Sequence, residues 1–180
     1  LKLIGVTGTD GKTSVSTIST YLLNHISKAA NIGTNGIFYN NQIYDNLFTT
    51  PILCENYRLF TEFNKNNIKY ASMEVSSEGI ANHRIDNILF DYAIFTNLSH
   101  EHLNTHKTMH NYFLTKLKLF KQLKKDGLRI INKDDYYARF FEDFDNVVYY
   151  SLFSPSDFQA INIKYYNGYT TFDLKAKDYI

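Results

Sequence analysis

The sequence predicts an α/β fold in which helices flank a mainly parallel sheet. Short, mostly apolar runs of the kind found in buried parallel strands alternate with segments of helical periodicity. Strands that alternate with helices in this way are typical of βαβ units. The end of the chain departs from the alternation, because two strand-like runs flank Asn167-Gly168, which is a strong hairpin signal. We therefore expect a small antiparallel addition at the C-terminal end of the main sheet.

The elements follow in order from these patterns. Residues 1–7 form an apolar run that ends in a glycine turn, and residues 12–27 continue as a helix. Three further apolar runs predict parallel strands at 69–75, 91–96 and 128–132. Helical patterns separate them at 51–64, where Pro51 occupies a favoured first-turn position, and at 109–124. The hairpin strands are expected at 158–166 and 169–175.

Length and composition bound the possible functions. The 180 residues suffice for one domain with a sizeable core, and a start at Leu1 rather than Met suggests a fragment of a longer protein. A formal net charge of +1 gives no electrostatic drive toward nucleic acid or an anionic membrane. The 15 Tyr and 14 Phe are spread along the chain, so we expect them to pack in the core.

Cysteine usage and hydropathy point to a compartment. A single cysteine, Cys54, excludes an internal disulfide and a CxxC zinc site, and the default is a reducing cytoplasm. No apolar run approaches the roughly 20 residues that span a bilayer, and the N-terminus lacks a signal-peptide layout. We expect a soluble, cytoplasmic monomer that binds no nucleic acid.

A glycine-rich segment joins the first predicted strand to the first predicted helix and reads Gly5-Val6-Thr7-Gly8-Thr9-Asp10-Gly11-Lys12-Thr13-Ser14. Glycines let N–H groups converge on phosphate oxygens, and the helix N-terminus adds partial positive charge. We expect Lys12 to reach the β- and γ-phosphates of a nucleotide and Thr13 to offer its hydroxyl to Mg²⁺. The generic pattern has glycine where Val6 stands, so the segment fits the variant Gly-Thr-x-Gly-Lys-Thr. A plain glycine turn is the alternative interpretation.

Acidic and histidine side chains downstream are candidates for metal binding. Glu74 closes the predicted strand 69–75, where phosphate-loop enzymes place a carboxylate for Mg²⁺ or water, although a lone carboxylate at a strand end is commonplace. Four histidines gather in one short segment: His100, His102, His106 and His110. A transition-metal cluster is one interpretation. A subset that serves Mg²⁺ or phosphate, with the rest on the surface, is the preferred one.

Lys116 lies where an apolar residue is expected. At about 100° per residue, the helix 109–124 has an apolar stripe made of Met109, Tyr112, Phe113, Leu119, Phe120 and Leu123, and Lys116 falls in its middle. Burial disfavours the charged amine, and neutral buried lysines are suited to covalent chemistry. The alternative is a lysine that extends past the helix edge into solvent.

Several motifs, in order along nearly the whole chain, resemble the central domain of the Mur ligases of peptidoglycan synthesis, and most of all the MurE group. They are Gly8-Thr9-Asp10-Gly11-Lys12-Thr13-Ser14, Thr49-Thr50-Pro51, Met73-Glu74-Val75-Ser76-Ser77, His83-Arg84, Phe95-Thr96-Asn97-Leu98, Glu101-His102-Leu103 with His106, and Tyr112-Phe113 with Lys116. The resemblance implies that residues 1–180 are the ATP-binding domain, with N-terminal UDP-binding and C-terminal amino-acid-binding domains outside this chain.

The resemblance also implies an activity and a set of roles. ATP activates the terminal carboxylate of UDP-MurNAc-L-Ala-D-Glu as an acyl phosphate, and the amine of an amino acid then attacks it to form an amide. The nucleotide contacts are Gly8, Thr9, Asp10, Gly11, Lys12, Thr13 and Ser14. One Mg²⁺ is assigned to Thr13 and Glu74, and a second to His102 and Lys116, which carries a CO₂-derived carbamate. The muramoyl peptide contacts are Thr49, Thr50, Ser76 and Arg84, and the catalytic set is Lys12, Glu74, His102 and Lys116.

Some positions depart from the MurE pattern, and other functions stay open. Glu78 stands where His is usual, Glu101 where Asp is usual and Asn104 where Asp is common. Folylpolyglutamate synthase and other Mur ligases (MurC, MurD, MurF) share parts of the pattern. A P-loop GTPase is a less favoured alternative. A non-catalytic nucleotide-binding module is the remaining alternative.

Overall fold

A computed structural model describes residues 1–101 and 106–177. Its strands form a single ten-stranded sheet in the order β10-β9-β8-β7-β6-β1-β5-β2-β3-β4. The parallel part contains β1 (Lys2–Thr7), β2 (Ala29–Gly33), β5 (Tyr70–Glu74), β6 (Phe90–Phe95), β7 (Leu123–Asn132) and β8 (Val147–Ser151). The predicted α/β fold with a mainly parallel sheet is confirmed.

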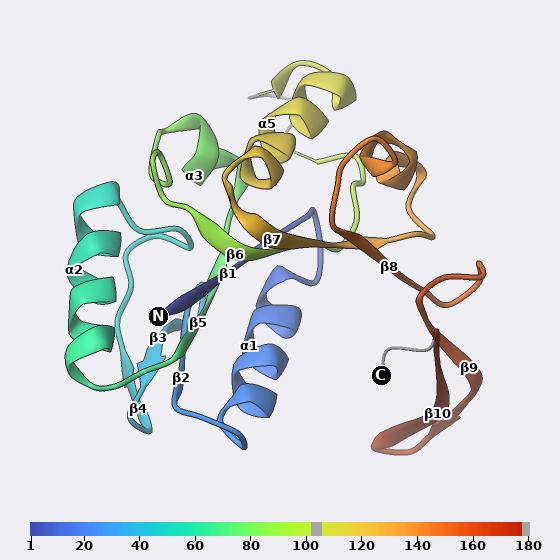
Figure 1. Cartoon of the computed structure of the whole chain (residues 1–180), viewed down its shortest axis with the longest axis horizontal. Coiled ribbons are helices and arrows are strands. Elements are labelled where there is room, and N and C mark those ends of the chain that lie inside the picture. The colour runs from blue at the N-terminus through green and yellow to red at the C-terminus, as the bar shows by residue number, and fades with distance from the viewer. Residues whose placement is uncertain (102–105, 178–180) are drawn as a thin grey trace.

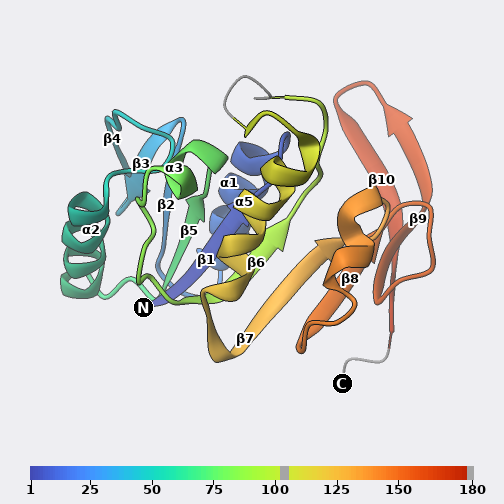
Figure 2. The ribbon, with the colours of Figure 1, turned by 90° about the horizontal axis from the view of Figure 1, so that it is seen from above.

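Antiparallel strands extend the sheet at both ends. At one end, β3 (Gly36–Tyr39) and β4 (Gln42–Tyr44) continue from β2. At the other end lies the hairpin of β9 (Phe158–Tyr166) and β10 (Tyr169–Ala176), and Figure 2 shows the two additions far apart. The C-terminal hairpin about Asn167-Gly168 is confirmed, whereas the β3–β4 addition was not predicted.

Helices cover the two faces of the sheet unequally. Figure 1 shows α1 (Lys12–Leu23) on one face, with α3 (Ser77–Ala81) and α5 (Met109–Lys121) on the other. The main core lies on the α5 side, where α2 (Leu53–Lys65) contributes Leu59, Phe60 and Phe63, and the short 3₁₀ helix η1 (Tyr136–Phe141) contributes Phe141. A second, small cluster on the α1 side contains Ile4, Val6 and Ile94. None of the helices within 1–101 and 106–177 is long and apolar enough to span a bilayer.

Two predicted helix ends were wrong. The first helix ends at Leu23 instead of residue 27, because the Asn24 side chain hydrogen-bonds both the N–H and the C=O of Ala29 and turns the chain into β2. The helix 109–124 ends at Lys121, since the carbonyl of Gln122 accepts the N–H of Phe90 and Leu123 already pairs with β6. Leu123 therefore belongs to a strand and not to the apolar stripe of the helix.

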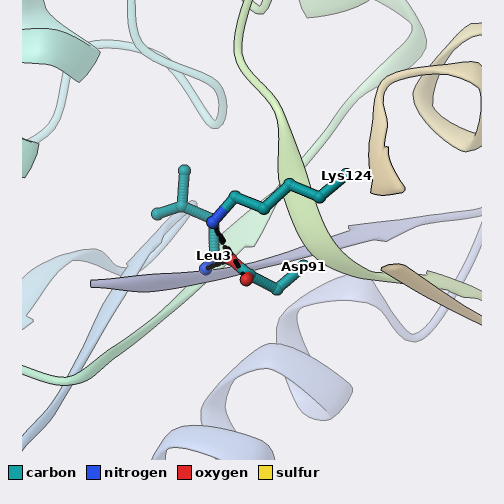
Figure 3. Close-up of polar contacts among 3 residues, drawn as sticks. All are labelled: Leu3, Asp91 and Lys124. Carbon is teal, nitrogen blue, oxygen red and sulfur yellow. Dashed lines mark hydrogen bonds and ion pairs between the residues drawn. The ribbon is translucent and has the colours of Figure 1, made fainter. Parts of the chain in front are cut away.

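One partly buried carboxylate links three strands of the parallel sheet (Figure 3). Asp91 on β6 accepts the backbone N–H of Leu3 on β1 at 2.8 Å, and it forms an ion pair with Lys124 on β7 at 2.8 Å. The single side chain thus joins three neighbouring strands at the end of the sheet opposite the glycine loop. Because a charge-assisted bond to a backbone N–H contributes more than a neutral one, Asp91 helps to set the register of the strands that position that loop.

Candidate active site

The glycine loop connects β1 to α1 and rests against the end of β6. Gly8 has φ 153°, and a Cβ there would lie 1.8 Å from Thr96 Oγ1, so only glycine fits. Asp10 is held through its main chain: Asn97 Oδ1 accepts its N–H at 2.9 Å and Thr96 Oγ1 donates to its carbonyl at 2.6 Å. The turn that Gly8 begins is therefore anchored by side chains of the neighbouring strand end, and it delivers the N-terminus of α1 to the site.

Two lysine amines meet at this loop. Lys12 Nζ donates to the carbonyls of Gly8 at 3.2 Å and Thr9 at 2.7 Å. Lys116 Nζ, from α5 on the opposite side, donates to the same Gly8 carbonyl at 2.7 Å and lies 4.4 Å from the ring centroid of Tyr112. The predicted burial of Lys116 in the apolar stripe is confirmed, since its exposed fraction is 1%.

The environment of Lys116 favours the neutral amine. Burial is the main cause, followed by the nearby charge of Lys12, and together they lower the pKa of Lys116 from 10.5 to about 7, although Glu101 acts in the opposite direction. A primary amine with such a pKa is substantially unprotonated at neutral pH. Lys116 is therefore a nucleophilic amine placed at a phosphate-type loop.

The lowered pKa predicts a pH dependence of stability. Between pH 7 and 10.5 the unfolded chain holds a proton on Lys116 that the folded chain lacks. The free energy of unfolding should therefore rise with pH in this window, by up to about 1.4 kcal/mol per unit from this group, and show no slope from it below the window. Urea unfolding of the wild type and of Lys116→Met in CO₂-free buffer at pH 7 to 9.5 measures the difference. Parallel curves for the two proteins would contradict the prediction.

Glu74 ends β5 and organises the other side of the site. Its exposed fraction is 1%. Oε2 accepts from the hydroxyls of Thr13 at 2.8 Å and Thr34 at 3.2 Å, and Oε1 accepts the backbone N–H of Thr34 at 2.8 Å. The predicted neighbours Thr13 and Glu74 thus lie within hydrogen-bond distance of each other. Thr34 was missed, because it lies in a turn after a strand that the sequence pattern did not reveal.

Gly33 makes room for this carboxylate. A Cβ at Gly33 would lie 2.0 Å from Glu74 Oε1. We expect Gly33→Ala to displace the Glu74 carboxylate and to destabilise the protein by about 1–3 kcal/mol. Urea unfolding measures this effect. Glu74→Asp removes the atom that lies 2.0 Å from the added Cβ and should reduce the clash, so the two substitutions should be non-additive in a double-mutant cycle. Additive losses would argue against the steric explanation.

The four residues proposed for substrate contact lie together. Thr50 Oγ1 donates to the Glu74 carbonyl at 2.9 Å and accepts the N–H of Ser76 at 2.9 Å, while the hydroxyls of Thr49 and Thr34 are 3.0 Å apart. Arg84 Nη1 donates to the Thr50 carbonyl at 3.1 Å, and its guanidinium carbon lies 4.0 Å from the centroid of the Phe48 ring. Segments that are distant in sequence therefore form one wall.

A cleft of about 360 Å³ joins the two halves of the site. Both lysines, Thr13 and Glu74 line it, together with Thr34, Leu47, Phe48, Thr49, Ser76, Ser77, Glu78, Arg84 and Tyr112. Cations, hydroxyls and a carboxylate thus face the same space, next to a helix N-terminus. Hydroxyl and carboxylate oxygens suit Mg²⁺, and the lysines with the loop N–H groups suit phosphate. The residues present therefore fit a Mg²⁺–nucleotide.

Among the described residues, His100, His106, His110 and Ser14 do not line the cleft. His102 lies outside the described residues, as does Asn104. His100 and His110 are exposed, whereas His106 is buried and stacks on Tyr112 with ring centroids 5.0 Å apart. Within the described ranges, no three His, Cys, Asp or Glu side chains group as a metal site, so the full histidine cluster gains no support there. Ser14 is exposed on α1 and does not line the cleft.

Comparisons with known proteins identify relatives of the chain. The Mur ligase middle domain family matches residues 6–179. A UDP-N-acetylmuramyl-tripeptide synthetase 2 from Oceanobacillus iheyensis is 40% identical over 184 residues, which cover 97% of this chain and 37% of that protein. A UDP-N-acetylmuramoyl-L-alanyl-D-glutamate–2,6-diaminopimelate ligase 1 from Clostridium acetobutylicum is 39% identical over 181 residues, 97% of this chain and 36% of that protein.

A solved structure of a UDP-N-acetylmuramoyl-L-alanyl-D-glutamate–2,6-diaminopimelate ligase has the same fold. It superposes with a TM-score of 0.84 at 29% identity, over 98% of this chain and 37% of that chain. A solved MurF ligase from Thermotoga maritima in complex with ADP superposes with a TM-score of 0.66 at 18% identity, over 97% of this chain and 38% of that one. The chain thus spans little more than a third of the length of its relatives.

Proposed function

The chain belongs to the Mur ligase family, and from this we propose that it is the ATP-binding domain of a ligase that adds an amino acid to UDP-MurNAc-L-Ala-D-Glu. The observation that carries the proposal is the convergence of Lys12 and Lys116 on the Gly8 carbonyl, opposite the Thr13–Glu74 pair, in one cleft. Phosphoryl transfer between two anions needs cations and fixed donors in this arrangement, because a carboxylate and a polyphosphate repel each other.

The loop and α1 are proposed to hold ATP. The N–H groups of residues 8–14 and the start of the helix bind phosphate oxygens. The Lys12 ammonium leaves the carbonyls of Gly8 and Thr9 and binds the β- and γ-phosphates instead. Thr13 and Glu74 would hold one Mg²⁺, which supplies charge neutralisation on the phosphates when it is bound. The hydrogen bond that the Thr13 hydroxyl donates to Glu74 fixes this hydroxyl in the orientation that metal binding requires.

Lys116 is proposed to react with CO₂. The unprotonated amine attacks the carbon of CO₂, forms an N–C bond and loses one proton, which leaves a carbamate anion. The carbamate oxygens, together with His102, would hold a second Mg²⁺, as the resemblance implies. The support is the burial of Lys116 and the lowering of its pKa to about 7. An ordinary surface lysine, protonated at neutral pH, would not react in this way.

The reaction is proposed to proceed in two steps. The terminal carboxylate of the muramoyl peptide, held by Thr49, Thr50, Ser76 and Arg84, attacks the γ-phosphorus of ATP and displaces ADP. The resulting acyl phosphate is attacked by the amine of the amino acid, which releases phosphate and a proton and forms the amide. Thr49, Ser76 and Arg84 line the same cleft as Lys12, and the buried Thr50 lies behind them, so both reactants can meet without leaving the cleft.

The remaining domains are proposed to complete the enzyme. Residues 1–180 would be the central domain, with a UDP-binding domain before it and an amino-acid-binding domain after it, in a cytoplasmic monomer. The isolated chain should then bind nucleotide weakly and form no amide. The identity of the added amino acid, whether lysine, diaminopimelate or another diamine, would be decided mostly by the domain that follows.

Phosphate release by the full-length protein tests the proposal. ATP, Mg²⁺ and UDP-MurNAc-L-Ala-D-Glu are supplied with a panel of amino acids, beside dihydrofolate with glutamate. We expect release that needs both the muramoyl dipeptide and one diamino acid. Activity only with the folate pair would assign a folylpolyglutamate synthase, and no release with either pair would favour a non-catalytic module.

A further inference from the structure

We propose that Asn56 is a positioning residue for the substrate side of the cleft, where its side-chain amide holds the Arg84 segment against the Thr50–Pro51 turn and so sets the affinity for the UDP-muramoyl peptide. The inference rests on the proposed function and adds a residue to it. Asn56 belongs to none of the motifs that mark the site in the sequence, and it does not line the cleft.

The amide of Asn56 joins two segments that are far apart in the chain. Asn56 lies on α2 with an exposed fraction of 0%. Its Nδ2 donates one hydrogen bond to the Pro51 carbonyl at 3.0 Å and a second to the Arg84 carbonyl at 2.9 Å. The two N–H groups of one side-chain amide are thereby used on two backbone carbonyls. The distance between the turn at Pro51 and the segment at Arg84 is fixed by this link.

Arg84 is held from its other end by the same turn. Its Nη1 donates to the Thr50 carbonyl at 3.1 Å, and its guanidinium lies 4.0 Å from the centroid of the Phe48 ring. Asn56 therefore fixes the backbone of Arg84, while Thr50 and Phe48 orient its side chain in the cleft. A guanidinium has five N–H donors in a rigid plane, which suits the carboxylates and phosphates of an anionic substrate. The position of the Arg84 guanidinium matters because two parallel hydrogen bonds to one carboxylate or phosphate tolerate little displacement.

Packing alone does not explain an asparagine here. The other buried side chains of α2 that face the core, Leu59, Phe60 and Phe63, are apolar. The Oδ1 atom of Asn56 is buried and has no hydrogen-bond partner among the described residues, which costs stability. The contribution of this side chain is therefore its two N–H bonds to the substrate wall and not the filling of the core.

Asn56→Leu in the full-length protein is the test, with Asn64→Leu as the matched control. Leucine has the same branching and the same number of side-chain heavy atoms but no donor, and Asn64 is an exposed residue of the same helix. We expect the KM for UDP-MurNAc-L-Ala-D-Glu to rise about tenfold, which corresponds to the loss of one well-placed contact. The KM for ATP and the kcat at saturating substrate should stay within about twofold, because the phosphate loop is not touched. Asn64→Leu should change none of the three constants.

The outcomes separate this inference from the proposed function. An unchanged KM for the muramoyl substrate, or an equal rise in the KM for ATP, would overturn the role of Asn56 while the function stands. A wild-type protein that does not use the muramoyl dipeptide would overturn both. If Asn56→Leu melts too low to assay, Asn56→Ser, whose smaller side chain lets water reach the two carbonyls, should raise the same KM; a normal KM in that variant would reject the proposal.

Discussion

Lys116→Ala is expected to abolish turnover by the full-length protein, with kcat reduced at least about a thousandfold, as for loss of a group that stabilises transition-state charge. A short carboxylate such as acetate or formate, added at high concentration, should restore much of the activity. Steady-state phosphate release with and without the carboxylate measures both effects. The rescue follows from the proposed carbamate. A free carboxylate bound in the space left by the side chain offers the same pair of oxygens as the carbamate would.

The physical reason lies in the packing around Lys116. Its amine reaches the phosphate loop at the Gly8 carbonyl, 2.7 Å away, and is enclosed by the Tyr112 ring. Alanine leaves a pocket that opens into the cleft, and a small anion can enter it. A larger carboxylate that exceeds the volume of the lost side chain should rescue poorly, which provides a size control.

Lys118→Ala serves as the matched control, because Lys118 is exposed on the same helix and makes no contact with the cleft. Its activity should equal that of the wild type with and without added carboxylate. Full activity of Lys116→Ala would reject the carbamate assignment. If activity is lost without any rescue in a protein that melts normally, the role of Lys116 would be its hydrogen bond with the Gly8 carbonyl and not a carbamate.

The place of the glycine loop and the burial of Lys116 could be predicted from the sequence, and the reason is local periodicity. The loop lies between a predicted strand and a predicted helix, so its place at the edge of the sheet follows from chain order. Lys116 could be placed because a helix of 13 residues repeats its apolar positions often enough to show which face is buried. Both inferences needed only a short stretch of sequence.

The residues that depend on tertiary packing could not be predicted in this way. Strands β2, β3 and β4 are three to five residues long, too short for a periodic signal, so Thr34 and its bond to Glu74 were invisible. The role of Gly33 arises from the approach of a carboxylate 41 residues away, and Asn56 acts on a carbonyl 28 residues away. Such contacts arise from strand order and helix docking, which no local pattern encodes.

Glu74→Gln should lower kcat about a hundredfold or more and raise the Mg²⁺ concentration needed for half-maximal activity. The amide is nearly isosteric, so its oxygen can still accept the N–H of Thr34, while the hydroxyls of Thr13 and Thr34 can turn to accept from its NH₂ group. The fold should therefore persist, with a melting temperature within a few degrees, and the change isolates the negative charge. Phosphate release titrated with Mg²⁺, together with a thermal melt, measures these quantities.

The charge of Glu74 matters because the side chain is buried, so no anion from solvent can take the place of its carboxylate. The carboxylate is 1% exposed and its oxygens are already directed at Thr13 and Thr34. Any cation attracted to it is thereby located beside the start of α1, where the phosphates are proposed to bind. Glu142→Gln, which removes a carboxylate at an exposed position outside the cleft, should leave the Mg²⁺ dependence unchanged. If Glu74→Gln matched the wild type in both kcat and Mg²⁺ dependence, Glu74 would serve only to hold the Thr34 turn, and the metal site would have to be sought elsewhere in the cleft.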